Sequence, residues 1–301
     1  MSETISKESV FIITPVYNRK ETTLSCLENL KRCGVLQRYH SVIVDDGSTD
    51  GTTAAVNALY PDVTVLAGNG DLWWTGAMAR GMQYAFEQGA EYLIWLNDDC
   101  IPEPDTLAQL VNFLRSHPNT IAGPSCYSYR SNLLIQEHNA FKGRKGCTAN
   151  PGEVIFVDGL SGWCVGMPAS VFRQIGPPNA AKFPHYSGDD TYIWKATRSG
   201  FKACVVGDIK VTLVGPVHPK LNFRSYFQAN LTPADTFYAL FWSKKSPYRL
   251  PTLFFYQTER YGLLLGGLFF LIKLITWLGQ WVRLQLILWL KPKVLNLGDG
   301  V

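Results

Sequence analysis

Two adjacent carboxylates, Asp98 and Asp99, stand directly after the apolar run 92–96 and Asn97. A short apolar run of this kind predicts a buried strand of a parallel sheet. Ligands of open α/β sheets lie outside the carboxyl ends of the strands, so we expect both carboxylates beside a substrate. Neighbouring negative charges call for a cation, and hard oxygen ligands suit Mg²⁺ or Mn²⁺ shared with phosphate oxygens. A solvated turn is the alternative, and for an isolated Asp-Asp pair we would favour it.

Three further loops carry polar groups or carboxylates at the ends of predicted elements. Residues 14–19 and 45–51 each follow a predicted strand, and residues 187–190 precede a predicted helix. The loops at 14–19, 45–51 and 97–99 should converge at one edge of the sheet, where a nucleotide can bind. For Asp50 and Asp189 a plain N-cap at a helix start is an equally good interpretation.

The elements that position these loops alternate along the first 125 residues. Apolar runs predict strands at 10–13, 41–44, 63–67 and 92–96. Helical spacing and helix start signals predict helices at 20–33, 49–59, 75–88 and 104–116. Strands joined by crossover helices imply an α/β fold with a mostly parallel, doubly wound, twisted sheet and flanking helices.

The pattern changes after residue 124. Residues 124–151 are polar, and we expect an irregular excursion or a hairpin there. Strands are predicted at 154–160, 164–167, 202–206 and 210–214, and helices at 169–175 and 190–199.

The C-terminal segment 262–290 is almost entirely apolar and long enough to cross a bilayer, which takes about 20 residues. Its polar residues fall on one face of a helix, with Ile287 as an interruption: Lys273, Thr276, Gln280, Arg283 and Lys291. A cationic stripe opposite Trp, Leu and Phe is typical of a helix that lies in the membrane interface. We place interfacial contact first, a true span second and a buried helical hairpin third.

Composition excludes some classes of function. A formal net charge of +4, with no basic run interleaved with aromatic residues, argues against nucleic-acid binding. The seven cysteines are scattered and form no Cys-x-x-Cys pair, which indicates reduced thiols in a cytosolic protein. Neither Cys100 nor Cys164 has the sequence context of a nucleophile. The first nine residues lack the apolar stretch of a signal peptide.

Taken together, the motifs resemble those of the family 2 glycosyltransferases, which have a GT-A fold (a nucleotide-diphospho-sugar transferase fold). The resemblance runs over residues 10–214. It rests on the loops 14–19 and 44–52, the segment 68–77, the Leu-Asn-Asp-Asp run 96–99, and Gly-Asp-Asp at 188–190 followed by Arg-Ser-Gly-Phe at 198–201. The segment 68–77 is similar to the donor side of bacterial rhamnosyltransferase-like members. Two positions depart from the family pattern: Asn97 replaces the first Asp of Asp-x-Asp, and Asp189 replaces a Glu.

The resemblance implies roles for the acidic residues. Asp99 would hold Mg²⁺ or Mn²⁺ and Asp98 would lie nearer the sugar or ribose. Asp190 would be the general base that deprotonates the acceptor hydroxyl, with Asp189 and Trp163 on the acceptor side. Related enzymes often place a third metal ligand at the position of His218, although an ordinary loop histidine is equally probable there.

Glycosyl transfer also needs groups that bind the donor. Asp45 or Asp46, with backbone groups of Thr14, Pro15 and Val16, fits the nucleobase and ribose. Asn18, Asn69 and Trp73 are the other expected donor contacts, and Arg80 could assist at the diphosphate. Asn69-Gly70 has a turn as its alternative, and of Trp73 and Trp74 we expect one in the core and one lining the site.

The sequence therefore predicts an inverting, metal-dependent glycosyltransferase that extends a surface polysaccharide at the cytoplasmic face of the cell membrane. The catalytic domain is expected over 1–220, with a nucleotide-sugar half at 1–125 and an acceptor half at 126–220, and a membrane-associating helical region over 221–301. Its expected partners are a UDP- or dTDP-sugar, a glycan or lipid-linked acceptor and the inner membrane surface. The alternatives are a non-catalytic, membrane-attached nucleotide-sugar binding protein and a sugar-phosphate nucleotidylyltransferase, although the loop 14–19 lacks the glycines that the latter requires.

Overall fold

The structure is a computed structural model that describes residues 7–135, 140–143, 145–214, 223–227 and 231–295. The chain divides into two compact units. The first comprises Met1–Pro184 and Gly188–Val217, and the second comprises His185–Ser187 and His218–Val301. Each unit is described by itself.

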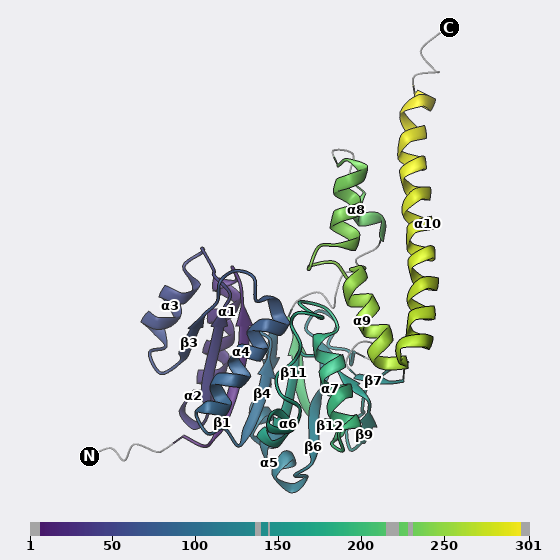
Figure 1. Cartoon of the computed structure of the whole chain (residues 1–301). Helices are drawn as coiled ribbons and strands as arrows, with labels where there is room; N and C mark the ends of the chain where they lie inside the picture. Colours follow the sequence, from purple (N-terminus) through teal and green to yellow (C-terminus); the bar gives the residue numbers. More distant parts are fainter. Residues whose placement is uncertain (1–6, 136–139, 144, 215–222, 228–230, 296–301) are drawn as a thin grey trace, which may run out of the picture. The chain divides into compact units, whose positions relative to one another are not determined.

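The first unit is built on one large mixed sheet (Figure 1). Its strand order is β3 (Thr64–Ala67), β2 (His40–Asp45), β1 (Val10–Val16), β4 (Tyr92–Leu96), β11 (Cys164–Pro168), β6 (Thr120–Ser128), β12 (Lys202–Leu213) and β5 (Cys100–Pro102), with β9 (Val154–Val157) also paired to β12. The four strands from β3 to β4 run parallel, as predicted, while β11 runs antiparallel to both β4 and β6.

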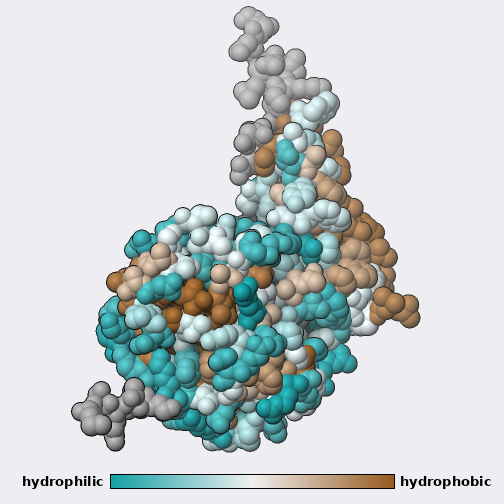
Figure 2. All heavy atoms as spheres, turned by 60° about the vertical axis from the view of Figure 1, so that its left-hand side comes forward, coloured by the Kyte–Doolittle hydropathy of each residue, from teal (hydrophilic) through white to brown (hydrophobic). Residues whose placement is uncertain are grey.

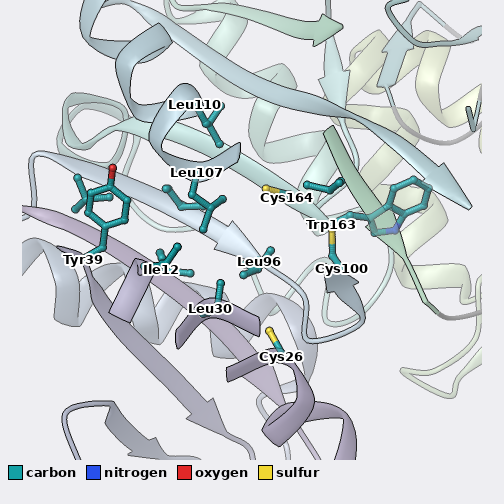
Figure 3. Packing of buried hydrophobic residues seen from close by; sticks show 14 of the residues in the cluster. Ile12, Cys26, Leu30, Tyr39, Leu96, Cys100, Leu107, Leu110, Trp163 and Cys164 are labelled. Carbon is teal, nitrogen blue, oxygen red and sulfur yellow. The ribbon is translucent and has the colours of Figure 1, made fainter. Parts of the chain in front are cut away.

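Helices cover both faces of this sheet, and the alternation of side chains along β1 shows why. Val10 and Ile12 belong to the core shared with α1 (Lys20–Arg32), α3 (Thr52–Leu59) and α5 (Thr106–Ser116). Phe11 and Ile13 belong to the opposite core, shared with α4 (Trp73–Glu87), α6 (Ala169–Ile175) and α7 (Gly188–Arg198). Because successive side chains of a strand point to opposite faces, an apolar run supplies both cores. Figure 3 shows the first core, where Ile12 and Leu96 from the sheet meet Leu30 and Leu107 from the helices.

The structure differs from the sequence expectation mainly after residue 116. The polar region contains a hairpin, β7 (Ala140–Lys142) and β8 (Lys145–Cys147), which with β10 (Gly159–Leu160) forms a small second sheet. The strand β6, which precedes that hairpin, was not predicted. The two strands predicted at 202–206 and 210–214 are one strand, β12, because an irregularity between Val206 and Lys210 interrupts its apolar pattern without ending its pairing with β6.

The second unit is helical. It contains the 3-10 turn η1 (Phe223–Tyr226), α8 (Pro233–Phe241), α9 (Leu250–Tyr261) and α10 (Leu263–Leu295). A capping box begins α8: the Thr232 side chain accepts from the Asp235 amide, and the Asp235 side chain accepts from the Thr232 amide. Phe223, Leu240 and Phe241 form a small core, on which Trp277 and Trp281 of α10 pack.

Helix α10 is long and apolar enough to cross a membrane by length and composition, over Leu263–Leu290, although a single such helix is weak evidence of a span. Only 6% of its most apolar window is buried in the structure. The predicted polar stripe is exposed at Lys273, Thr276, Gln280 and Arg283, whereas the side chain of Lys291 lies outside the described ones. A second stripe, Leu268, Ile275 and Val282, is apolar and also exposed. Figure 2 shows hydrophobic side chains gathered along one side of these helices.

Candidate active site

The two carboxylates that follow β4 have different environments. Asp98 is 2% exposed, and its Oδ2 accepts a hydrogen bond of 3.1 Å from the Thr23 hydroxyl. The side chain of Asp99 is 29% exposed. Burial and the neighbouring charge of Asp99 raise the pKa of Asp98 to about 6, while the Arg19 guanidinium opposes this shift. Of the pair, Asp99 is therefore the carboxylate that is open to a ligand from solvent.

Arg19 lies against both carboxylates. Its Nη2 is 3.3 Å from Oδ1 of Asp98 and 3.0 Å from Oδ2 of Asp99. The protein itself therefore supplies a cationic group that partly neutralises the two adjacent negative charges. Arg19 is thus a site residue that the sequence pattern does not single out. What could have indicated this role is that Arg19 is a cationic residue in the loop after β1. Strand β1 is the parallel neighbour of β4, so the ends of the two strands lie side by side.

Hydrogen bonds to the loop after β2 fix the backbone on both sides of Arg19. Asn18 has a positive φ of 50°, its amide donates to the Ser48 hydroxyl over 2.8 Å, and its side-chain oxygen accepts from the Thr49 amide over 2.7 Å. The Lys20 amide donates to Oδ2 of Asp50 over 2.9 Å. The predicted donor contact Asn18 and the N-cap candidate Asp50 thus join the first two loops.

Asp45 and Asp46 are buried, and both hold the loops around them. Asp45 accepts from the Ser48 amide and the Thr53 hydroxyl. Asp46 accepts three backbone N–H groups, those of Gly70, Leu72 and Trp73, over 2.8 to 3.1 Å. A carboxylate at this place satisfies donors at the start of α4 and suits the positive end of the helix dipole. Both carboxylates therefore stabilise the loops around the site, which is a structural role separate from the donor contact expected of them.

The two tryptophans that begin α4 are placed differently. Trp73 has a positive φ of 57°, and its Nε1 donates to Asp71 over 2.9 Å. Trp74 packs against the second core, with its ring perpendicular to that of Trp95, and its Nε1 donates to Oδ1 of Asn97 over 2.9 Å. Asn69 accepts from the Asp71 amide, which fits the turn interpretation.

The acids that begin α7 are tied to the same place. Oδ2 of Asp189 accepts from the Gly162 amide over 2.7 Å, and its Oδ1 accepts from the Asp190 amide over 2.8 Å. A Cβ on Gly162 would lie 2.2 Å from the Trp74 ring, so only glycine lets the chain pass there. Asp190 lies over β10, with its Cβ 3.6 Å from where a Cβ of Gly159 would stand. One indole, that of Trp74, therefore lies between Asn97 at the end of β4 and the loop that holds α7.

Several predicted residues are placed away from solvent or away from this cluster. Trp163 is 8% exposed and belongs to the first core (Figure 3), so its ring serves packing, while its carbonyl accepts from the Asn97 amide. Arg80 is exposed two turns into α4. Thr14, Pro15 and Val16 continue β1 and pair with β2, which takes up part of their backbone polar groups. His218 lies outside the described residues.

Comparisons with known proteins decide the family. The sequence matches the model of the glycosyl transferase family 2 over residues 11–175, more than half of the 301 residues. The chain belongs to this family. It is a glycosyltransferase, and the nucleotidylyltransferase and non-catalytic alternatives find no support. No curated protein matches the sequence significantly.

Two solved structures share the fold of this family 2 chain. One is GalNAc-T7 with UDP, GalNAc and Mn²⁺, at 13% identity and a TM-score of 0.56; the match covers 83% of this chain but only half of that one. The other is a mannosyltransferase from Pyrobaculum calidifontis with GDP-Man and Mn²⁺, at 19% identity and a TM-score of 0.54, covering 98% of this chain and 82% of that one. The expected GT-A fold is confirmed.

The acidic pair suits a divalent cation that shares its ligands with a substrate. Among the described residues no group of three or more His, Cys, Asp or Glu side chains is gathered into a metal cage. Mg²⁺ at a nucleotide site is ordinarily held by one or two carboxylates, phosphate oxygens and water. The partly exposed Asp99 beside the buried Asp98 offers such a set, so the residues present fit the ion.

Proposed function

We propose that this family 2 enzyme is an inverting, metal-dependent glycosyltransferase that moves a sugar from a nucleoside diphosphate sugar to a glycan or lipid-linked acceptor in surface polysaccharide synthesis. The observation that supports it best is the linkage of Asn97, Trp74, Gly162 and Asp189. This linkage ties the end of β4, with its acidic pair, to the start of α7, with its candidate base. A transferase needs both groups around one substrate.

In this proposal each acid has its own role. Asp99, with Asp98 behind it, would hold Mn²⁺ or Mg²⁺, which neutralises the charge that develops on the leaving diphosphate. The two matched solved structures contain Mn²⁺, which supports this choice of ion. Asp190 would accept the proton of the acceptor hydroxyl as the oxygen attacks the anomeric carbon. A base on the side opposite the leaving group gives direct displacement and therefore inversion.

A binding experiment can identify the nucleobase of the sugar donor. The melting temperature should be measured with UDP, dTDP, GDP and ADP, each with and without Mn²⁺. A ligand that binds only the folded state increases the free energy of unfolding, by about 2.7 kcal/mol at a concentration a hundredfold above Kd, and so raises the melting temperature. We expect a metal-dependent rise with UDP or dTDP. No rise with any of the four would contradict the proposed donor site.

The role of Asp190 is tested by Asp190→Asn, which keeps the size of the side chain but removes the base. Transfer of sugar should fall by about 10² to 10⁴, while the metal-dependent rise in melting temperature with the nucleoside diphosphate stays. Asp208, an exposed acid on β12 whose carboxylate accepts from the Gly152 amide, gives a matched control as Asp208→Asn. If Asp190→Asn transferred sugar as fast as the wild type, Asp190 could not be the general base.

The helical unit supports a location at the inner membrane surface. The polar stripe of α10 carries Lys273 and Arg283, and the exposed apolar stripe carries Leu268, Ile275 and Val282. Charged and apolar faces on one exposed helix are the features of interfacial binding. We propose that residues 221–301 bring the catalytic region, 1–220, to a lipid-linked or surface glycan acceptor.

A further inference from the structure

The Arg19 guanidinium lies where a cation shared by Asp98 and Asp99 would lie. One nitrogen, Nη2, contacts an oxygen of each carboxylate, at 3.3 Å and 3.0 Å. A divalent ion shared by the two carboxylates would need the space that Nη2 occupies. The two positive charges would also repel each other there. Metal binding to the pair therefore requires the guanidinium to withdraw.

The backbone of Arg19 is held so that its side chain returns to this place. The Asn18 amide is bound by Ser48, and the Lys20 amide is bound by Asp50. The side chain itself is 43% exposed, so it has room to withdraw toward solvent. The main chain is thus fixed while the charged end remains free to exchange.

We propose that Arg19 is an internal counter-ion that competes with the metal for the Asp98–Asp99 pair and weakens the binding of free metal. This inference rests on the proposed metal site and adds a regulation of it. The competing guanidinium keeps metal alone from occupying the site firmly, so that firm binding needs the additional phosphate ligands of the donor. Such a device favours entry of metal and nucleotide together.

The test is the affinity of the full-length protein for Mn²⁺ alone, measured by electron paramagnetic resonance of unbound Mn²⁺. Arg19→Gln keeps a long polar side chain without the charge, and we expect it to bind Mn²⁺ about threefold to fivefold more tightly than the wild type, the range of a partly exposed ion pair. Arg19→Lys keeps the charge and should stay near the wild-type affinity. Arg38→Gln breaks a pair with Glu8 at the opposite end of β1 and should change nothing.

The outcomes separate this inference from the proposed function. If Asp99→Asn abolishes Mn²⁺ binding but Arg19→Gln binds as the wild type does, or more weakly, the metal site stands and the counter-ion role is overturned. If neither the wild type nor Arg19→Gln binds Mn²⁺ alone, the counter-ion role is overturned, and the melting series with nucleoside diphosphates and Mn²⁺ decides separately whether the metal site stands. Melting temperatures of the variants without ligand report whether they are folded. A lower value for Arg19→Gln without tighter Mn²⁺ binding would mean that Arg19 only holds the loop.

Discussion

At the scale of single residues, the two carboxylates after β4 differ in what surrounds them more than in chemistry. Arg19 contacts both, but Asp98 is buried and accepts from the Thr23 hydroxyl, whereas the side chain of Asp99 is partly exposed to solvent. A buried carboxylate that already accepts hydrogen bonds shapes the turn, and a partly exposed one can take a ligand. Asp46 is of the first kind, because its oxygens accept hydrogen bonds from three backbone amides.

Replacing the two acids should therefore have unequal effects. Asp99→Ala should abolish the metal-dependent rise in melting temperature with the nucleoside diphosphate, because the exposed ligand is gone. Asp98→Asn keeps an oxygen for the Thr23 hydroxyl and should retain a reduced rise. The measurement is the melting series described above. Equal loss in both variants would contradict the assignment of the metal chiefly to Asp99.

Asp46→Ala should destabilise the fold. Gly70, Leu72 and Trp73 would lose the acceptor of their backbone N–H groups, and we expect a loss of about 2 to 4 kcal/mol in the free energy of unfolding. Urea denaturation measures it. Asp46→Asn keeps one acceptor oxygen and should lose less, and the exposed Asp62→Ala should lose almost nothing. A loss no larger in Asp46→Ala than in Asp62→Ala would refute this structural role.

At the scale of elements, the contact between α4 and the start of α7 sets the distance between the donor and acceptor sides. A Cβ on Gly188 would lie 2.0 Å from the hydroxyl oxygen of Thr75, which is buried in α4. The amide of Thr75 donates to the Pro184 carbonyl over 3.1 Å, which fixes the two segments further. Close packing here carries Asp189 and Asp190 on a rigid helix start, as a site that must hold reacting atoms requires.

Gly188→Ala should push the start of α7 away from α4. Sugar transfer should fall by about tenfold or more, since an ångström of misplacement is costly to catalysis. Binding of the nucleoside diphosphate with metal should persist, because the end of β4 is untouched. The double variant Thr75→Ala with Gly188→Ala removes the two closest contacts, at 2.0 and 2.9 Å, and leaves Cβ of residue 75 at 3.0 Å, so it should recover part of the activity. Full activity in the single variant would show that α7 tolerates the shift.

At the scale of the whole molecule, the chain combines a catalytic unit of the GT-A fold with a helical unit that keeps much apolar surface exposed. Leu268, Ile275 and Val282 of α10 are 52%, 70% and 47% exposed. Large exposed apolar surface marks an interaction site. In the proposed location at the membrane, the charged stripe on the same helix would contact anionic lipid headgroups.

Replacing Leu268, Ile275 and Val282 together by Gln should release the protein from vesicles. The partition coefficient between vesicles and water should fall by at least about tenfold, since each apolar side chain contributes about 1.5 to 3 kcal/mol when removed from water. Flotation with vesicles that contain phosphatidylserine measures the effect. Leu59→Gln, at an exposed site on α3, is the control.

A second pair of variants separates an interfacial helix from a span. Lys273→Gln with Arg283→Gln should weaken binding to anionic vesicles but not to neutral ones, because the cationic stripe would contact headgroups. Alkaline carbonate should release an interfacial helix. Retention through that wash, with no effect of the charge variants, would favour the span.

Much of the catalytic fold is readable along the chain. The strands at 10–13, 41–44, 63–67 and 92–96 and the helices between them are confirmed, because their apolar periodicity directly reflects which face is buried. The strand β6, the insertion of antiparallel β11 beside β4 and the joining of two predicted strands into β12 are not readable. They depend on pairing between residues far apart in sequence.

The amino-acid sequence by itself determined the residue types of the site, since the acids at 98–99 and 189–190 and the loop at 45–51 follow from local pattern, and it determined the family. Only the tertiary structure decided what each side chain faces. Burial separates Asp98 from Asp99, hydrogen bonds turn Asp46 inward, core packing takes the ring of Trp163, and the parallel pairing of β1 with β4 brings Arg19 to the acidic pair. Burial and distance are properties of the packed chain, so no local pattern encodes them.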